Sequence, residues 1–184
     1  MTYYEELYHH GVKGMKWGVR RYQNPDGTLT SEGKKRLRSD MAEEYQGRGY
    51  SKGKAKRNAR RDTRMYNTFS KYEEKSIKKR GKVETKLEKA KQGSFKSKRL
   101  GQKWINNRAD ELFYDKKQKN IMEDSEAAAT FMKRYWTANL VGGGLYFAYK
   151  EQMDPNSYTN RNQAQYDAAK VQARREYEKK YGTN

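Results

Sequence analysis

Seven basic side chains lie in one stretch of the chain, between Ser51 and Arg64, where Asp62 is the only carboxylate. Clustered ammonium and guanidinium groups bind polyanions, because each phosphate that they neutralise releases a condensed counterion. On a helix they would cover much of the circumference, and the small residues Ala55 and Ala59 would allow a phosphate backbone to approach closely. The candidate nucleic-acid-binding residues are therefore Lys52, Lys54, Lys56, Arg57, Arg60, Arg61 and Arg64.

The same stretch can also be interpreted as a solvated, partly disordered linker. The charge distribution favours the binding interpretation. Residues 51–100 hold 19 basic and 5 acidic side chains in a chain whose net charge is +19. Solubility alone would be served by scattered charge, so this local excess indicates a surface for an anionic partner. Residues suited to base edges follow no known recognition pattern, and we expect binding that is independent of nucleotide sequence.

Catalytic chemistry is not indicated. The chain has no cysteine, which excludes thiolate nucleophiles and disulfides. His9 and His10 are adjacent and would point in different directions, whereas a zinc site needs three or four convergent ligands. Carboxylates such as Asp110 and Glu111 lie among lysines on an expected helix, which is typical of solvated ion pairs. The sequence predicts a protein that is not an enzyme and uses no cofactor or metal.

The N-terminal segment has an unusual composition. Lys13, Lys16, Arg20 and Arg21 surround Trp17, on which a base could stack, although a role for Trp17 in the core of a small β-hairpin is favoured. The turn signal that follows, at residues 24–27, supports the hairpin. The segment is richer in Trp, His, Met and Gly than a hairpin requires. We hypothesise a partner-docking motif made of His10, Gly11, Lys13, Gly14, Lys16, Trp17, Arg20 and Arg21.

Apolar spacing places helices over most of the remaining chain. Thr30 or Ser31 can cap a helix through Leu37, Met41 and Tyr45, which are spaced by four. Further helices are expected at residues 53–80, 83–90, 95–123, 126–150 with an interruption at 142–144, and 159–181. The helix at 95–123 has an apolar face made of Leu100, Trp104, Ile105, Ala109, Leu112 and Phe113.

The composition limits the size of the core. Leu, Ile, Val and Phe together number 21 of 184 residues, and 16 tyrosines partly compensate. We expect an all-α fold of long solvated helices, with a small N-terminal β-hairpin and a partly disordered basic segment. The expected parts are a docking module at 1–30, a basic helical arm at 31–99 and a helical domain at 100–184.

The most apolar stretch runs from Leu140 to Tyr149. As a helix it would span about half a bilayer, and no apolar run reaches the length of a membrane-spanning helix. Packing of this stretch in the core, with a bend at the glycines, is favoured over insertion into a membrane or a partner. Binding to a membrane is not expected.

The segment from Tyr8 to Thr30 reads YHHGVKGMKWGVRRYQNPDGTLT and is followed by Gly-Lys-Lys-Arg at 33–36. It resembles a segment of structural proteins from bacteriophages and prophages of Gram-positive bacteria, often head or minor capsid components. The resemblance implies a virion-associated protein, located in the virion and in the host cytoplasm during assembly. It implies no chemistry.

Together these observations predict a phage virion structural protein that binds nucleic acid, with DNA favoured, without sequence specificity. Other virion proteins are expected partners, and association of copies of the chain stays open. One alternative is an assembly adaptor whose basic helix meets acidic protein surfaces. Another is an injected effector that binds host nucleic acid or membrane.

Overall fold

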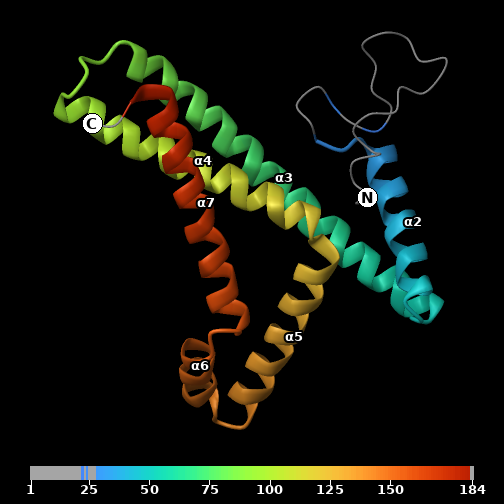
Figure 1. Cartoon of the computed structure of the whole chain (residues 1–184). Coiled ribbons are helices and arrows are strands. Elements are labelled where there is room, and N and C mark those ends of the chain that lie inside the picture. Colours follow the sequence, from blue (N-terminus) through green and yellow to red (C-terminus); the bar gives the residue numbers. More distant parts are fainter. Residues whose placement is uncertain (1–21, 23, 25–27, 183–184) are drawn as a thin grey trace, which may run out of the picture. The chain divides into compact units, whose positions relative to one another are not determined.

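The computed structural model describes Tyr22, Asn24 and residues 28–182, and these residues form helices and no strand (Figure 1). The all-α class is therefore confirmed for the described part of the chain. The helices are α2 (Ser31–Gly47), α3 (Lys52–Glu88), α4 (Phe95–Lys119), α5 (Ile121–Leu140), α6 (Gly144–Met153) and α7 (Tyr158–Tyr181).

Three of the helices begin next to a side-chain hydroxyl that accepts a hydrogen bond from a backbone N–H of the first turn. In α4 this is Ser94, which accepts from the N–H of Ser97 at 3.2 Å. The hydroxyl of Thr30 accepts a hydrogen bond from the N–H of Gly33 at 3.1 Å. The hydroxyl of Ser157 accepts one from the N–H of Asn160, also at 3.1 Å. Such caps stabilise a helix by about 1 kcal/mol. The expected cap at the start of the first described helix is therefore confirmed at Thr30.

Packing divides the chain into two compact units. The first comprises Met1–Lys71 and Asp115–Met122, and the second comprises Tyr72–Tyr114 and Glu123–Asn184. This division differs from the expected parts at 1–30, 31–99 and 100–184. The difference arises because the N-terminal part of α3 packs with α2, whereas its C-terminal part packs with α4 and α7. A helix of 37 residues is long enough to serve two cores.

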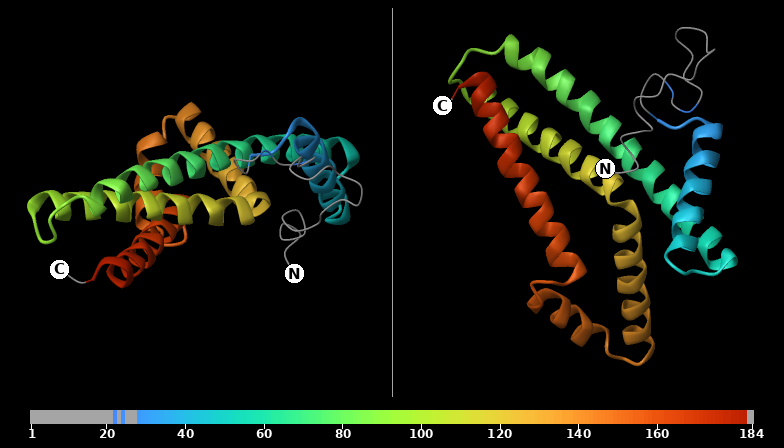
Figure 2. Two further views of the ribbon diagram at one scale, coloured as in Figure 1. Left: turned by 90° about the horizontal axis from the view of Figure 1, so that it is seen from above. Right: turned by 45° about the vertical axis from the view of Figure 1, so that its right-hand side comes forward.

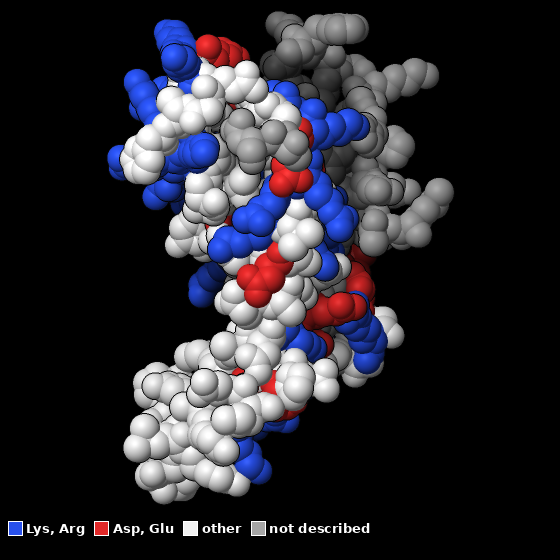
Figure 3. Space-filling view, turned by 60° about the vertical axis from the view of Figure 1, so that its left-hand side comes forward, with Lys and Arg blue, Asp and Glu red and all other residues white. Residues whose placement is uncertain are grey.

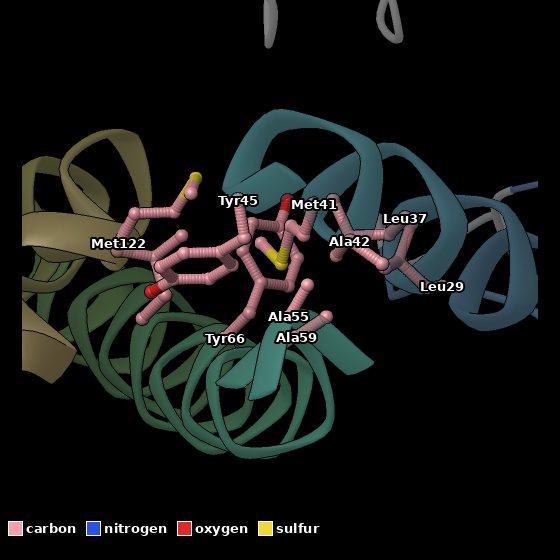
Figure 4. Close-up of a cluster of buried hydrophobic side chains, with 10 residues drawn as sticks. Leu29, Leu37, Met41, Ala42, Tyr45, Ala55, Ala59, Tyr66 and Met122 are labelled. Atoms are coloured by element: carbon pink, nitrogen blue, oxygen red, sulfur yellow. The ribbon is translucent and has the colours of Figure 1, made fainter. Parts of the chain in front are cut away.

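The first unit has a core between α2 and the beginning of α3 (Figure 4). Leu37, Met41 and Tyr45 project from α2, as their spacing predicts, and all three are buried. The facing side of α3 contributes small residues, so the two backbones can approach closely. The full set of buried apolar residues is Leu29, Leu37, Met41, Ala42, Tyr45, Ala55, Ala59, Tyr66, Ile121 and Met122.

The second unit is built from the C-terminal part of α3, from α4 and from α7, which lies beside α4 in both views of Figure 2. Trp104 is 3 % exposed and packs against the rings of Tyr177 and Tyr181, with centroids 5.6 and 6.1 Å away. Its indole N–H donates to the carboxylate of Glu84 at 2.8 Å. The apolar face that the sequence predicts for residues 100–113 is confirmed, since all six of its residues belong to this core.

Ion pairs join the three helices of this second core. Arg80 of α3 contacts Glu111 of α4 at 2.9 Å, and Arg108 of α4 contacts both Glu111 and, at 2.6 Å, Glu176 of α7. Burial alone would lower the pKa of Arg108, but the hydrogen bond with Glu176 and the charge of Glu111 raise it. Glu111 and Glu176 therefore neutralise Arg80 and Arg108, and these ion pairs hold the helices together.

Acid should weaken this network. The hydrogen bond from Arg108 lowers the pKa of Glu176 below its ordinary value of 4.5. A carboxylate with a depressed folded-state pKa stabilises the fold above its unfolded-state pKa, and this contribution is lost as the pH falls through the folded-state value. We expect Glu176→Gln to lower the urea midpoint at about pH 6, with the difference from the native chain shrinking below about pH 4. A difference that stays constant across that range would contradict the contribution of Glu176.

The structure corrects several expectations. The basic segment at 51–64 is not partly disordered but helical from Lys52, because its inner side packs into the first core. Gly81 does not interrupt α3, and the helix expected at 95–123 ends at Lys119, with α5 beginning at Ile121. The hairpin stays a prediction, because Trp17 and residues 25–27 of the turn lie outside the described residues.

Candidate nucleic-acid interface

The seven predicted cations all lie in the first turns of α3. Their side chains are exposed except for that of Arg61, which is half-buried. They are brought together as expected, on consecutive turns of one rigid element. The row formed by Lys52, Lys56, Arg60 and Arg64, at intervals of four, rises about 18 Å along the helix axis.

The cations face away from the core because the opposite side of α3 packs against α2 in the first core. Ala55 and Ala59 are fully buried, and Tyr66 is 6 % exposed. The expectation that the two alanines would let a phosphate backbone approach is therefore wrong. Their small size instead allows α2 to approach α3. At 3.6 residues per turn, burial of this side leaves the intervening basic positions on the solvent side.

Asp62, the carboxylate among these cations, is fully buried and hydrogen-bonded within the first core. The hydroxyl of Tyr45 donates to its Oδ2 at 2.7 Å, and the Nε of Arg61 donates to its Oδ1 at 3.1 Å. Buried carboxylates need such donors, because leaving one without partners costs several kcal/mol. Asp62 and Arg61 thus form part of the packing between α2 and α3, and the Asp62 charge does not lie on the exposed side.

The other six cations keep their charge available to solvent. Among the described residues, no carboxylate lies within 4.0 Å of Lys52, Lys54, Lys56, Arg57, Arg60 or Arg64. The ammonium of Lys54 lies over the ring of Tyr50, 4.5 Å from its centroid. These six residues define the basic face of α3. Arg61 stands apart from it as a structural residue.

The second unit carries a further basic group that the predicted site did not include. It surrounds the turn between α3 and α4, where Lys and Arg side chains gather at one end of the unit in Figure 3. Phe95 begins α4 there and is 83 % exposed. The charge count of residues 51–100 contains the signal for this group, which consists of the exposed residues Lys89, Lys91, Lys96, Lys98 and Arg99.

In the described part of the chain, no three His, Cys, Asp or Glu side chains converge. His9 and His10 lie outside it. The same holds for every residue of the hypothesised docking motif: His10, Gly11, Lys13, Gly14, Lys16, Trp17, Arg20 and Arg21. That motif therefore stays a prediction.

The described residues define an all-helical basic protein whose longest helix exposes one unpaired cationic face. Comparison with known protein families shows that residues 2–24 fit the model of a family of unknown function, DUF7211. This match falls on the segment whose composition stands out in the sequence. No curated protein and no solved structure matches the chain.

Proposed function

We propose that this protein is a virion-associated phage structural protein that binds nucleic acid non-specifically through the basic face of α3. DNA is the favoured nucleic acid. The observation that carries the binding proposal is a set of six exposed cations on one side of a helix, without a carboxylate partner among the described residues.

The geometry of this face suits a phosphate backbone. A DNA duplex carries one negative charge per about 1.7 Å, so the length of about 18 Å between Lys52 and Arg64 meets roughly ten phosphates. The duplex length facing this helix therefore carries more phosphates than the helix carries cations. Contacts to phosphates position a protein but carry no sequence information, which supports binding without sequence preference.

Buried packing also favours a docking surface over a flexible linker. Asp62, Ala55 and Ala59 fix the rotation of α3 about its axis, so the cations keep one direction in the first unit. Binding then costs little backbone ordering, since the helix is already formed.

The virion assignment rests on the resemblance of residues 8–30 to a segment of phage structural proteins. DNA packed in a virion presents phosphates at very high concentration, where an internal basic protein would be bound. Mass spectrometry of purified virions tests this part of the proposal. Absence of the chain from particles that contain the other structural proteins would contradict it and leave the binding proposal intact.

Nucleic-acid binding is tested with two variants that remove equal charge. The first replaces Lys52, Lys56, Arg57, Arg60 and Arg64 by Gln. The matched control replaces five exposed cations of α7 by Gln: Arg161, Lys170, Arg174, Arg175 and Lys179. Fluorescence anisotropy with a random-sequence duplex, over about 50–300 mM salt, measures the slope of log K against log salt.

We expect the α3 variant to lose affinity and to have a shallower slope, by about 0.9 for each phosphate contact removed. The α7 control should change the slope much less. Equal slopes for both variants would place binding elsewhere. A slope near zero for the native chain would contradict nucleic-acid binding and favour an adaptor that contacts protein surfaces.

A further inference from the structure

Most of the large apolar side chains that are exposed in the second unit lie on the hairpin formed by α5 and α6. At its tip, Leu140, Val141 and Leu145 are 85 %, 78 % and 90 % exposed. This contradicts the expectation that residues 140–149 pack within the core. Six more large side chains of the hairpin are also exposed: Met132, Tyr135, Trp136, Tyr146, Tyr149 and Met153.

The aromatic side chains on the inner side of the hairpin pack against one another, and the tip takes no part in this packing. The ring of Phe131 in α5 packs against Phe147 in α6, with centroids 5.7 Å apart, and against Tyr158, at 5.3 Å. The chain reverses at Gly142, whose φ of 74° is in the left-handed region that favours glycine. The N–H of Gly143 closes the turn on the carbonyl of Ala138 at 2.7 Å. The aliphatic tip therefore lies outside any core.

The charges near the tip of this hairpin are all positive, because its carboxylates lie at the far ends of the two helices, at Glu123, Asp124, Glu126 and Glu151. Residues 127–150 contain no Asp or Glu, and they contain three cations, Lys133, Arg134 and Lys150, all exposed. Figure 3 shows the resulting lobe, nearly free of acidic side chains, at the lower end of the view. A cluster of exposed large apolar side chains marks a contact site, and the positive charge near the tip favours an anionic partner.

We infer that the tip of the α5–α6 hairpin inserts into a lipid surface that contains anionic headgroups. The order of residue types along α5 matches the depth profile of such a surface. The aliphatic side chain of Leu140 comes first, Trp136 lies about 6 Å back along the helix, and Lys133 lies about 10 Å back. The hydrocarbon layer accommodates Leu140, the membrane interface favours the indole ring of Trp136, and lipid phosphates attract the ammonium group of Lys133.

Insertion is shallow in this arrangement. Interfacial helices bury their apolar side chains about 5–10 Å into the membrane, which corresponds to the distance from Lys133 to the tip. No helix of the described residues has the length and apolarity needed to cross a bilayer. A second copy of the chain fits the surface less well, because tip-to-tip contact would bring together the three cations of residues 127–150 from each copy, and this segment contains no carboxylate.

The test uses the full chain and sedimentation with vesicles of neutral phosphatidylcholine, with and without about 30 % phosphatidylserine. The variant Leu140→Glu/Leu145→Glu replaces two exposed side chains and should keep its helical circular dichroism. The matched control, Phe95→Glu/Val171→Glu, adds equal charge at exposed apolar positions outside the hairpin. We expect at least a tenfold loss of the bound fraction for the hairpin variant and less than a threefold loss for the control.

A second readout separates insertion from electrostatic attraction to the basic face of α3. Lipids brominated in their acyl chains should quench the fluorescence of the native chain, and Trp136→Phe should remove most of that quenching. Three outcomes would overturn the inference: no vesicle binding, equal loss in the hairpin variant and its control, or unchanged quenching in Trp136→Phe. Dimerisation abolished by Leu140→Glu/Leu145→Glu, without vesicle binding, would overturn it in favour of a second copy.

Discussion

Replacing Tyr45 by alanine should lower the free energy of unfolding of the first unit by about 3–5 kcal/mol. The ring of Tyr45 is fully buried between α2 and α3, and it contacts the ring of Tyr50 with centroids 5.3 Å apart. Its hydroxyl is one of the donors to the buried carboxylate of Asp62. The variant therefore creates a cavity and also removes a partner from a buried charge, and these two costs act together.

Amide hydrogen exchange measures this effect locally, and protection should fall in residues 31–71 before residues 158–181. Tyr45→Phe keeps the ring and removes the hydroxyl, so we expect a smaller loss of about 1–3 kcal/mol. Tyr146→Ala, at a ring that is 64 % exposed, serves as a control with an expected change below about 0.5 kcal/mol. Equal losses for Tyr45→Ala and Tyr146→Ala would contradict the position of Tyr45 in the core.

Trp104→Ala should have a comparable effect on the second unit, again about 3–5 kcal/mol. Trp104 joins all three helices of this core. Its ring meets Tyr177 and Tyr181 of α7, and its N–H is bonded to Glu84 of α3. The same carboxylate oxygen of Glu84 accepts from Lys180 at 2.8 Å. Burial alone would raise the pKa of Glu84, but the hydrogen bonds from Lys180 and Trp104 lower it.

Urea unfolding followed by circular dichroism measures the loss, and exchange in α7 should rise first. Trp104→Phe retains most of the apolar volume but loses the indole donor, so its cost should lie between those of the native chain and Trp104→Ala. The matched control is Trp136→Phe, at a ring that is 60 % exposed, with little expected change. A single transition that shifts equally for Tyr45→Ala and Trp104→Ala would contradict two separately packed units.

Cations have different roles in the two units. In the second unit, Arg80, Arg108 and Lys180 are held by carboxylates of neighbouring helices. In the first unit, the basic face of α3 has no such carboxylate among the described residues. Charge count alone does not distinguish these roles. The presence or absence of a carboxylate partner does distinguish them. The proposed variants therefore replace cations without such a partner, and we expect these replacements to change binding more than stability.

The sequence by itself determined the helices and the location of the surplus charge. Spacing by four at Leu37, Met41 and Tyr45 predicted a buried side of α2. The same kind of spacing predicted the apolar face of α4 around Trp104. Both follow from the 3.6-residue period, which is a local property. The cap at Thr30 is local as well, because it depends on a donor three residues away.

Tertiary structure alone decided which neighbours cover each helix. Asp62 stands in the sequence as the one carboxylate among seven cations, yet it is buried and bonded to Tyr45, a residue 17 positions earlier. Ala55 and Ala59 proved to be contacts for α2, and the apolar stretch at 140–149 proved to be an exposed tip. Burial depends on long-range packing, whereas a local pattern shows only which side of a helix is apolar.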